Sequence, residues 1–343
     1  MKKTKLIKDL NESDFMNLCE SWNYPKFHGA QIYKWLFQKK CNSVNEMSDL
    51  PLDLKHKLSD KFELDALSVF KKQKSKIDNT IKFLLKTLDA QFIETVSMIE
   101  DNRHTVCISS QIGCNVDCDF CATGKMGFKR NLSVGEILEQ LLIVNKNINH
   151  KVSNIVFMGM GEPFLNYNNV IKASQILSNP KGFNLSTKRI TISTAGILPK
   201  IEKYILEKHK YKLAISLNAS NDITRNKIMP INKKWDIDKL LLAIKKYSFN
   251  KHRILMFEYV LLKDFNDSDE DALELSRLLK NITCKINLIP FNEIYGKYKR
   301  PDQERIDSFA KILFNNRGDY RVFIRWSKGE DINAACGQLA TES

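Results

Sequence analysis

Six strand-like apolar runs follow one another with helical stretches between them, and this order constrains the fold more than any other feature of the chain. The pattern predicts strands at residues 154–159, 189–194, 212–217, 254–262, 285–291 and 320–326. A capping box of Ser133 and Glu136 opens one of the helices. Alternation of this kind is typical of βαβ units in an α/β fold with a parallel sheet, open or barrel-like. We therefore expect functional groups on loops at the carboxyl ends of the strands.

The region before this alternation is different in character. Residues 28–40 place apolar side chains at helical spacing, and Pro51 suits the first position of a second helix. A basic stretch, 70–76, then leads into strand-like runs at 81–88, 91–99 and 104–110, with a possible hairpin turn at Asp89 and Ala90. We expect a helical, helix-hairpin-helix-like accessory domain at 1–65, a β-hairpin linker at 66–95 and a core domain at 96–343.

The charge of the chain indicates a polyanionic partner. Its 343 residues carry a formal net charge of +14, which suits nucleic acid, although a lysine-rich proteome would give the same excess. No apolar run approaches a membrane span, and the charged start has no apolar core of a signal peptide. We expect a cytoplasmic protein whose eight cysteines are metal ligands or catalysts more often than disulfides.

Three of those cysteines lie within eight residues. Cys114, Cys118 and Cys121 have C-x3-C-x2-C spacing directly after a predicted strand. A structural zinc site wants four ligands, and no histidine lies close by. Three thiolates on a [4Fe–4S] cluster would leave one iron open for a small molecule. The spacing favours the cluster, with zinc as the alternative.

The motifs around these cysteines resemble those of the RlmN family of radical S-adenosylmethionine (SAM) enzymes, RNA adenine-C2 methyltransferases. The resemblance rests on CISSQIGCNVDCDFCATGKMGFKRNL, FMGMGEPFLNYNNV, RITISTAGI, IMPINKK and DINAACGQLA. It implies a partial (β/α)6 radical-SAM barrel, with SAM bound to the open iron of one cluster. It also assigns SAM contacts to Gly161, Glu162, Ser193, Ser216, Leu217, Asn218 and Asn292. Many relatives have histidine at the position of Asn218. A contact between SAM and the backbone would survive this difference, whereas a contact with the side chain is not implied.

The same resemblance implies roles for two further cysteines. Direct displacement from SAM cannot methylate the electron-poor C2 carbon of adenine, so a protein thiol carries the methyl group. One SAM would methylate Cys336, and a second would yield the radical that takes hydrogen from this S-methyl group. The methylene would join C2, and Cys107 would release the product by forming a transient disulfide with Cys336. Glu94 matches the proton acceptor. Cys19, Cys41 and Cys284 are expected to be small buried side chains without chemistry.

The resemblance also implies partners. These are 23S rRNA, at an adenosine of the peptidyl transferase centre, and tRNA, at the adenosine beside the anticodon. A reducing electron donor such as flavodoxin or ferredoxin would serve a protein that we expect to be a monomer. Basic residues with interleaved aromatic side chains suit RNA. They are Lys71, Lys72, Lys74, Lys76, Lys125, Lys129, Arg130 and Lys297–Arg300, with Phe128, Tyr295 and Tyr298.

Two other functions compete with this reading. A Cfr-type enzyme would methylate C8 of adenosine by the same two-cysteine mechanism. Pro163, which follows Gly161 and Glu162, favours the group that methylates C2. A non-enzymatic zinc module that binds RNA would leave Cys336, Cys107 and the Gly-Glu-Pro loop without a role.

Overall fold

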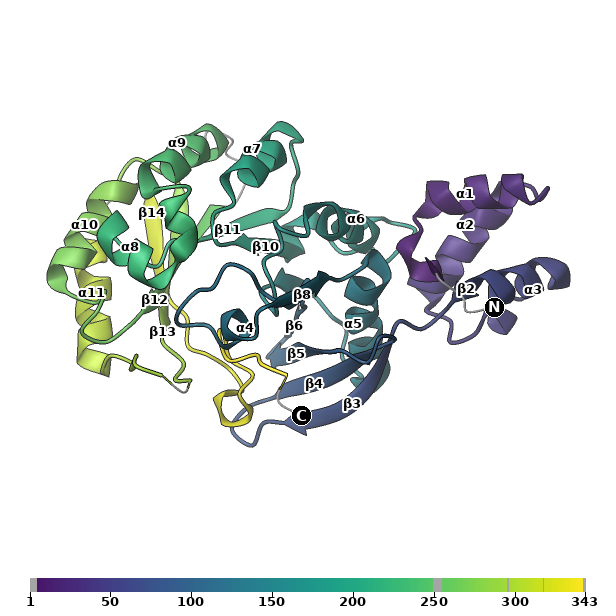
Figure 1. Ribbon diagram of the computed structural model, residues 1–343, viewed down its shortest axis with the longest axis horizontal. Helices are drawn as coiled ribbons and strands as arrows, with labels where there is room; N and C mark the ends of the chain where they lie inside the picture. Colours follow the sequence, from purple (N-terminus) through teal and green to yellow (C-terminus); the bar gives the residue numbers. More distant parts are fainter. Residues whose placement is uncertain (1–4, 249–254, 295, 317, 342–343) are drawn as a thin grey trace.

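One ten-stranded sheet organises the computed structural model, which describes residues 5–248, 255–294, 296–316 and 318–341 (Figure 1). The spatial order of its strands is β14-β13-β12-β11-β10-β9-β6-β5-β4-β3. Their bounds are β3 (Leu67–Lys74), β4 (Thr80–Thr87), β5 (Phe92–Glu100), β6 (Arg103–Cys107), β9 (Asn154–Phe157), β10 (Ile190–Thr194), β11 (Lys212–Ser216), β12 (Leu255–Leu261), β13 (Cys284–Pro290) and β14 (Tyr320–Ile324).

The part of the sheet from β6 to β14 is parallel and forms the predicted partial barrel. All six strands of the predicted alternation are present, although residue 254 of the fourth lies outside the described residues. Helices connect the strands and cover the sheet, so β11 buries Leu213, Ala214 and Ile215 in succession, as parallel strands do. The helices are α5 (Val134–Asn147), α6 (Tyr167–Ser178), α7 (Leu198–Leu206), α8 (Asp222–Ile228), α9 (Ile237–Ser248), α10 (Asp269–Leu279) and α11 (Gln303–Asn315).

The capping box predicted for one of these helices is present. Ser133 accepts a hydrogen bond from the backbone N–H of Glu136, whose side chain accepts one from Ser133 N–H, and α5 starts there. None of the helices in the described part of the chain combines the length and the apolar character that crossing a bilayer requires.

The N-terminal region forms a separate helical lobe (Figure 1). It contains α1 (Glu12–Ser21), α2 (Phe27–Lys34), α3 (Leu52–Lys61) and a short parallel pair, β1 (Lys5–Leu6) with β2 (Phe62–Glu63). The helix predicted at 28–40 is shorter, because a π-helical turn, Trp35–Lys39, follows α2 and Lys40 ends it with φ 57°. A buried ion pair between Lys8 and Glu139 of α5, 3.3 Å long, ties the lobe to the barrel.

An antiparallel extension joins the lobe to the barrel. The hairpin predicted at Asp89 and Ala90 connects β4 and β5, with φ 58° at Ala90. The basic stretch at 70–76 is more than a lead-in, because most of it belongs to β3, which pairs with β4 at the edge of the sheet. Lysines on an exposed edge prevent pairing with other chains, which explains a strand of this composition. β5 extends to Glu100, so the boundary expected at residue 95 falls inside a strand.

A small two-stranded sheet flanks the loop that carries Cys114, Cys118 and Cys121. Strands β7 (Gln111–Gly113) and β8 (Phe128–Asn131) pair on either side of it, and α4 (Ala122–Lys125) begins after Cys121. A side chain at Gly113 would place its Cβ 1.6 Å from the carbonyl oxygen of Gly127. Only glycine therefore allows the two strands to approach this closely.

Candidate active site

A cavity of about 180 Å³ lies at the carboxyl ends of the parallel strands and collects most of the residues that the sequence singled out. Those that line it are Cys114, Cys118, Cys121, Gly161, Glu162, Ser193, Ser216, Asn218, Asn292 and Cys336. They come from six separate segments between the loop after β7 and the C-terminal tail. Glu94, Cys107 and Leu217 are not among its lining residues.

The three cysteines of the loop face this cavity together with apolar neighbours, Val116 and Phe120. Loss of solvent raises the pKa of all three thiols, that of Cys114 to about 12. Thiolates in this surrounding therefore need a positive partner, which iron supplies. Within the described residues, no three His, Cys, Asp or Glu side chains converge as ligands of one metal ion. A [4Fe–4S] cluster needs no such convergence, since each cysteine binds its own iron, and the donor set fits it.

The Gly-Glu-Pro loop positions a carboxylate beside the cysteines. Glu162 is buried, and its two oxygens accept hydrogen bonds from Phe164 N–H, at 2.9 Å, and Ala195 N–H, at 2.7 Å. Burial nevertheless raises the pKa of Glu162 to about 7. Gly161 has φ 94°, and a Cβ there would lie 2.4 Å from Gln111 Cβ. The loop therefore fixes a carboxylate that has lone pairs left for a donor such as an amino group.

The loops after β10 and β11 are held by an arginine that the sequence analysis missed. Arg225 is completely buried and donates to the carbonyl oxygens of Ala195, Ser216 and Leu217 at 2.8, 3.0 and 2.9 Å. Leu217 itself points into the core, so only its backbone is available to the site. No short motif marks Arg225, because its three carbonyl partners come together only in the fold.

The side chain of Asn218 forms hydrogen bonds within the protein. Its Oδ1 accepts from Val260 N–H at 2.9 Å, and its Nδ2 donates to Met229 Sδ at 3.3 Å. Its backbone is left-handed, with φ 57°, a conformation that asparagine tolerates. The side chain of Asn218 is therefore engaged within the protein, and the contact between SAM and its backbone stays a prediction.

The C-terminal tail brings Cys336 to the mouth of the cavity. Asn292 Nδ2 donates to the Cys336 carbonyl oxygen at 2.9 Å, and Ala122 N–H donates to the next carbonyl, that of Gly337, at 2.7 Å. Cys336 is accessible to solvent. The surrounding protein, followed by the charges of Glu258 and Cys121, still raises the pKa of its thiol to about 11. A tail held at its backbone on both sides suits a side chain that must react.

Cys107 and Glu94 lie behind the cavity on neighbouring strands. Cys107 ends β6 opposite Val96 of β5, and Glu94 is two residues earlier on β5. Cys107 is buried, and desolvation, followed by the charge of Cys336, raises the pKa of its thiol. Both are free thiols in the structure. Glu94 is buried and forms an ion pair with Lys82 at 2.9 Å.

A second carboxylate lines the cavity and carried no signal in the sequence. Glu258 of β12 is buried, and its Oε1 accepts from Asn287 Nδ2 at 2.9 Å. Desolvation raises its pKa to about 7. It lies within an apolar strand-like run, where an isolated acidic residue gives no indication of which way it points.

The basic residues proposed for RNA differ in whether an acidic side chain already pairs with them. Lys125 and Lys297 both pair with Asp119, and Arg130 pairs with Asp89 and Glu136, so these cations already have partners. Lys71, Lys72, Lys74 and Lys76 are exposed on or next to the edge strand β3, and no ion pair joins them to an acidic side chain of the described chain. Tyr295 lies outside the described residues.

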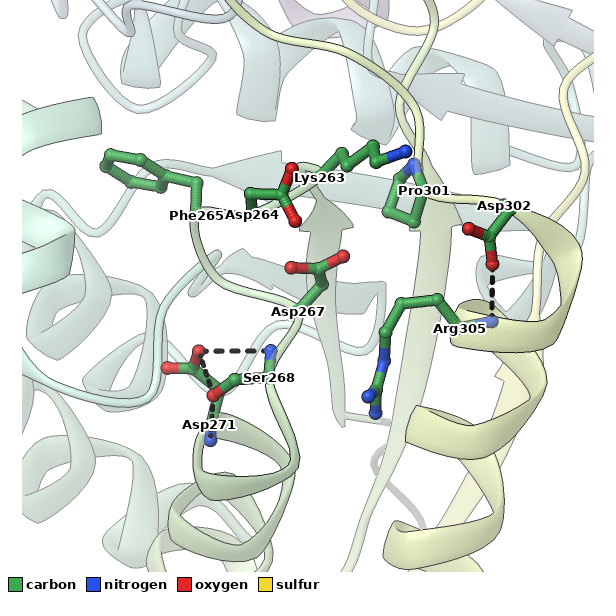
Figure 2. Close-up of a pocket in the computed structure, with 9 residues that line it drawn as sticks. All are labelled: Lys263, Asp264, Phe265, Asp267, Ser268, Asp271, Pro301, Asp302 and Arg305. Carbon is green, nitrogen blue, oxygen red and sulfur yellow. Dashed lines mark hydrogen bonds between the residues drawn. The ribbon is translucent and has the colours of Figure 1, made fainter.

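A larger cavity, about 570 Å³, lies elsewhere, between the first turns of α10 and α11 (Figure 2). Two of its four acidic side chains belong to local structure: Asp271 accepts from Ser268, and Asp302 caps α11 by accepting from Arg305 N–H at 2.9 Å. None of the predicted site residues lines it. The smaller cavity with the cysteines is therefore the candidate active site.

Known proteins resemble this chain in sequence and in fold. A model of the radical SAM superfamily matches residues 108–276, and one of the ribosomal RNA large subunit methyltransferase N-terminal domain matches 6–64. A probable dual-specificity RNA methyltransferase RlmN from Thermosipho melanesiensis is 41% identical and covers 98% of each chain. RlmN from Wigglesworthia glossinidia brevipalpis is 48% identical over 92% of this chain and 84% of its own.

A solved structure extends the likeness to three dimensions. A radical SAM methyltransferase from Sphaerobacter thermophilus superposes with a TM-score of 0.94 at 38% identity, over 99% of this chain and 100% of the other. The radical SAM superfamily binds a [4Fe–4S] cluster and SAM, which the three-cysteine loop and its cavity fit. The chain therefore belongs to the RlmN family of radical SAM methyltransferases.

Proposed function

We propose that this protein methylates C2 of adenosine in 23S rRNA and in tRNA beside the anticodon, with the methyl group carried on Cys336. The observation that carries the proposal is the single cavity in which the three-cysteine loop, the Gly-Glu-Pro loop and Cys336 meet. The names of its relatives, dual-specificity RNA methyltransferases, support the choice of two RNA substrates.

The proposed cofactors follow from the residues present. Cys114, Cys118 and Cys121 would hold one [4Fe–4S] cluster, which when bound supplies the electron that cleaves SAM. Glu162 would receive the amino group of SAM, with Gly161, Ser193, Ser216, Asn292 and the backbone of Leu217 and Asn218 around the rest of the molecule. Two SAM molecules would be used in each turnover, one for the methyl group and one for the radical.

The chain's own residues would then carry the product step. Once one hydrogen atom has been removed from it, the S-methyl carbon on Cys336 would bond to C2 of the adenine at the cavity mouth. Glu94 would take up the proton from C2, and the one electron left over would return to the bound cluster. Cys107 attacks the Cys336 sulfur, which forms a disulfide and breaks the bond between that sulfur and the methylene carbon. This carbon stays on adenine and takes up a proton to become the methyl group. Lys82, which pairs with Glu94 of β5, also donates to the Asn333 carbonyl oxygen at 3.2 Å. One side chain therefore connects β5 with the C-terminal tail.

The proposal extends to the organisation and surroundings of the protein. The lobe at 1–65 would be an RNA-binding accessory domain, 66–95 its link to the barrel, and 96–343 the catalytic core. A flavodoxin or ferredoxin would supply electrons to a monomeric, cytoplasmic enzyme. The exposed lysines along β3 would add phosphate contacts.

Mass spectrometry of adenosines from cellular RNA tests the function. Cells that make this protein should contain 2-methyladenosine in 23S rRNA and tRNA, and cells without it should lack the modification. A Cys118→Ala variant is the matched control, since it removes one proposed cluster ligand and should behave as the deletion. Appearance of 8-methyladenosine would assign the protein to the C8 group, and no methylated adenosine in either RNA would contradict both.

A further inference from the structure

Four cationic side chains come from the amino ends of parallel strands, away from the cysteines, and a fifth, Arg325, reaches back from the carboxyl end of β14 to Asn287. Arg103 begins β6, Arg189 directly precedes β10, Lys212 begins β11, Lys285 is the second residue of β13, and Arg325 directly follows β14. Successive side chains of a strand point to opposite faces, so residues an even number apart share a face. Lys212 therefore faces the same way as Ser216, and Lys285 the same way as Ile289, both of which line the active-site cavity.

Strand pairing and side-chain contacts, rather than a single row of the register, bring these residues together. Lys212 of β11 is one strand away from Thr191 of β10, its partner in the ladder, and Thr191 is two residues after Arg189. Lys285 pairs with Met256 of β12, two residues before the cavity residue Glu258. Arg103 donates to Thr105, whose strand partner Asn154 accepts from Arg189, and Arg325 donates to Asn287, two residues after Lys285. We call these five cations, which gather in one layer beside the cavity, the basic floor.

The basic floor has more positive charge than its two nearby acids, Glu100 and Glu258, can balance. Within the described residues, none of the five takes part in an ion pair. Three of them contact neutral partners instead: Arg103 donates to Thr105, Arg189 to Asn154 and Arg325 to Asn287. Of the nearby acids, Glu100 pairs with Lys328 and Glu258 accepts from Asn287. Desolvation, and then the neighbouring cations, lower the pKa of Lys212 and of Arg103.

An aromatic ring is part of the same layer. The Lys285 ammonium lies 5.4 Å and the Arg325 guanidinium 5.3 Å from the ring centre of Phe323 on β14. Arg103, Arg189 and Arg325 are exposed, and the two lysines are half-buried, so solvent reaches the layer. Cations around an accessible ring are typical of surfaces that hold phosphates and stack bases of single-stranded nucleic acid.

The distance to the reacting groups suits a substrate strand. Arg103 and Cys107 are four residues apart on β6, which corresponds to about 13 Å along a strand. A short stretch of unpaired RNA can span this length, with one base beside Cys336 and phosphates at the floor.

We propose that the basic floor binds phosphodiester groups next to the target adenosine, whose base lies at the cavity. This inference rests on the proposed function, because it assigns the position of that function's RNA substrate. The mutual repulsion of the five cations would be relieved when the phosphates arrive, and until then it is a cost in stability.

The test combines two charge-neutral variants with RNA of altered charge. Arg189→Gln with Lys285→Gln removes two cations of the floor. Arg277→Gln with Lys311→Gln, on the outer helices α10 and α11, removes the same charge from exposed positions and serves as the control. Binding of a labelled anticodon stem-loop is measured by fluorescence anisotropy over a range of salt, and again with one methylphosphonate linkage placed at each position around the adenosine.

In the floor variant, log affinity should fall less steeply with log salt, with a slope shallower by about 1.4 than in wild type. Each lost contact with a single strand contributes roughly 0.7. The control should keep the wild-type slope. At one or two linkages, a methylphosphonate should weaken binding to wild type and leave binding to the floor variant unchanged, because the phosphate and the cations act as a pair. The thermal midpoint of the floor variant should be equal to that of wild type or higher.

Slopes that match the control, or methylphosphonate effects that add to the substitutions at every position, would overturn the inference. Competition by inorganic phosphate without any dependence on linkage charge would do the same, since it would indicate a site for free anions. The wild-type protein is assayed for methylation of the same oligonucleotide. Methylation there, with control-like binding of the floor variant, would reject the floor alone and leave the proposed function standing.

Discussion

Glu162 illustrates how individual residues prepare the cavity for a charged ligand. Two backbone N–H groups, from Phe164 and Ala195, hold its carboxylate in place, and Gln111 Oε1 accepts from its own N–H at 2.8 Å. Each contact depends on the tight approach of the loop to Gln111, which Gly161 permits. Positioning by backbone groups costs little reorganisation when a ligand binds.

Gly161→Ala should therefore abolish SAM binding while the protein remains folded. The new Cβ would lie 2.4 Å from Gln111 Cβ in a backbone with φ 94°, and the loop would have to move away from Gln111. Gly127→Ala is the matched control, because Gly127 also has positive φ, at 69°, but no atom within 4 Å of the added Cβ. Equilibrium dialysis with labelled SAM compares the two. Equal affinity in both variants would contradict the role given to the loop.

Glu258 should make stability depend on pH. Its pKa is raised from 4.5 to about 7 by burial, so the protonated form stabilises the fold fully below pH 4.5. This contribution, up to about 3 kcal/mol, is lost as pH rises toward 7. Denaturant titrations at pH 5 and pH 7.5 should show a smaller decline in unfolding free energy for Glu258→Gln than for wild type. Glu270→Gln, exposed on α10, should decline as wild type does. Parallel declines in all three proteins would refute the assignment.

At the scale of elements, the turn between β3 and β4 holds the C-terminal tail that carries Cys336. Asp331 of the tail accepts from Ser75 Oγ at 2.7 Å and from Lys76 N–H at 2.8 Å, where β3 turns toward β4. Asp78 of the same turn accepts from Gly329 N–H at 2.9 Å. Figure 1 shows the yellow tail running back to this hairpin. The extension thus docks the segment that carries Cys336.

Asp331→Asn should loosen this dock, because an amide offers one acceptor oxygen where the carboxylate uses two. We expect faster hydrogen exchange across residues 329–339 and a several-fold loss of methylation, with unchanged iron content. Asp307→Asn, on the outer face of α11, should alter neither. Methylation at the wild-type rate in a protein with a mobile tail would show that the dock is dispensable.

The elements also show what a sequence can and cannot predict here. The parallel strands and the capping box at Ser133 were readable because their signals are local, in periodicity and spacing. β3 was harder to recognise, since lysines on an edge strand resemble a solvated loop. Arg225 and Glu258 could not be assigned, because their partners are distant in sequence and only the fold brings them together.

At the scale of the whole molecule, the cavity depends on parts of the chain that are far apart. Cys107 ends the first parallel strand, the three-cysteine loop follows it, and Cys336 returns from the C-terminal tail. The charge of Cys336 contributes to the raised pKa of Cys107, and that of Cys121 contributes to the raised pKa of Cys336. In the reaction that we propose, Cys336 acts first as the methyl carrier and Cys107 acts last as the resolving thiol.

Expression of single and double cysteine variants, followed by nuclease digestion and peptide mass spectrometry, tests these roles most directly. Cys107→Ala should still load and transfer the methylene but should stall, since no thiol can release it. The protein should then carry an RNA adenine linked through a methylene to Cys336, in the peptide DINAACGQLA. Cys336→Ala and the double variant should carry none. Normal turnover by Cys107→Ala, or RNA trapped on Cys336→Ala, would contradict the account.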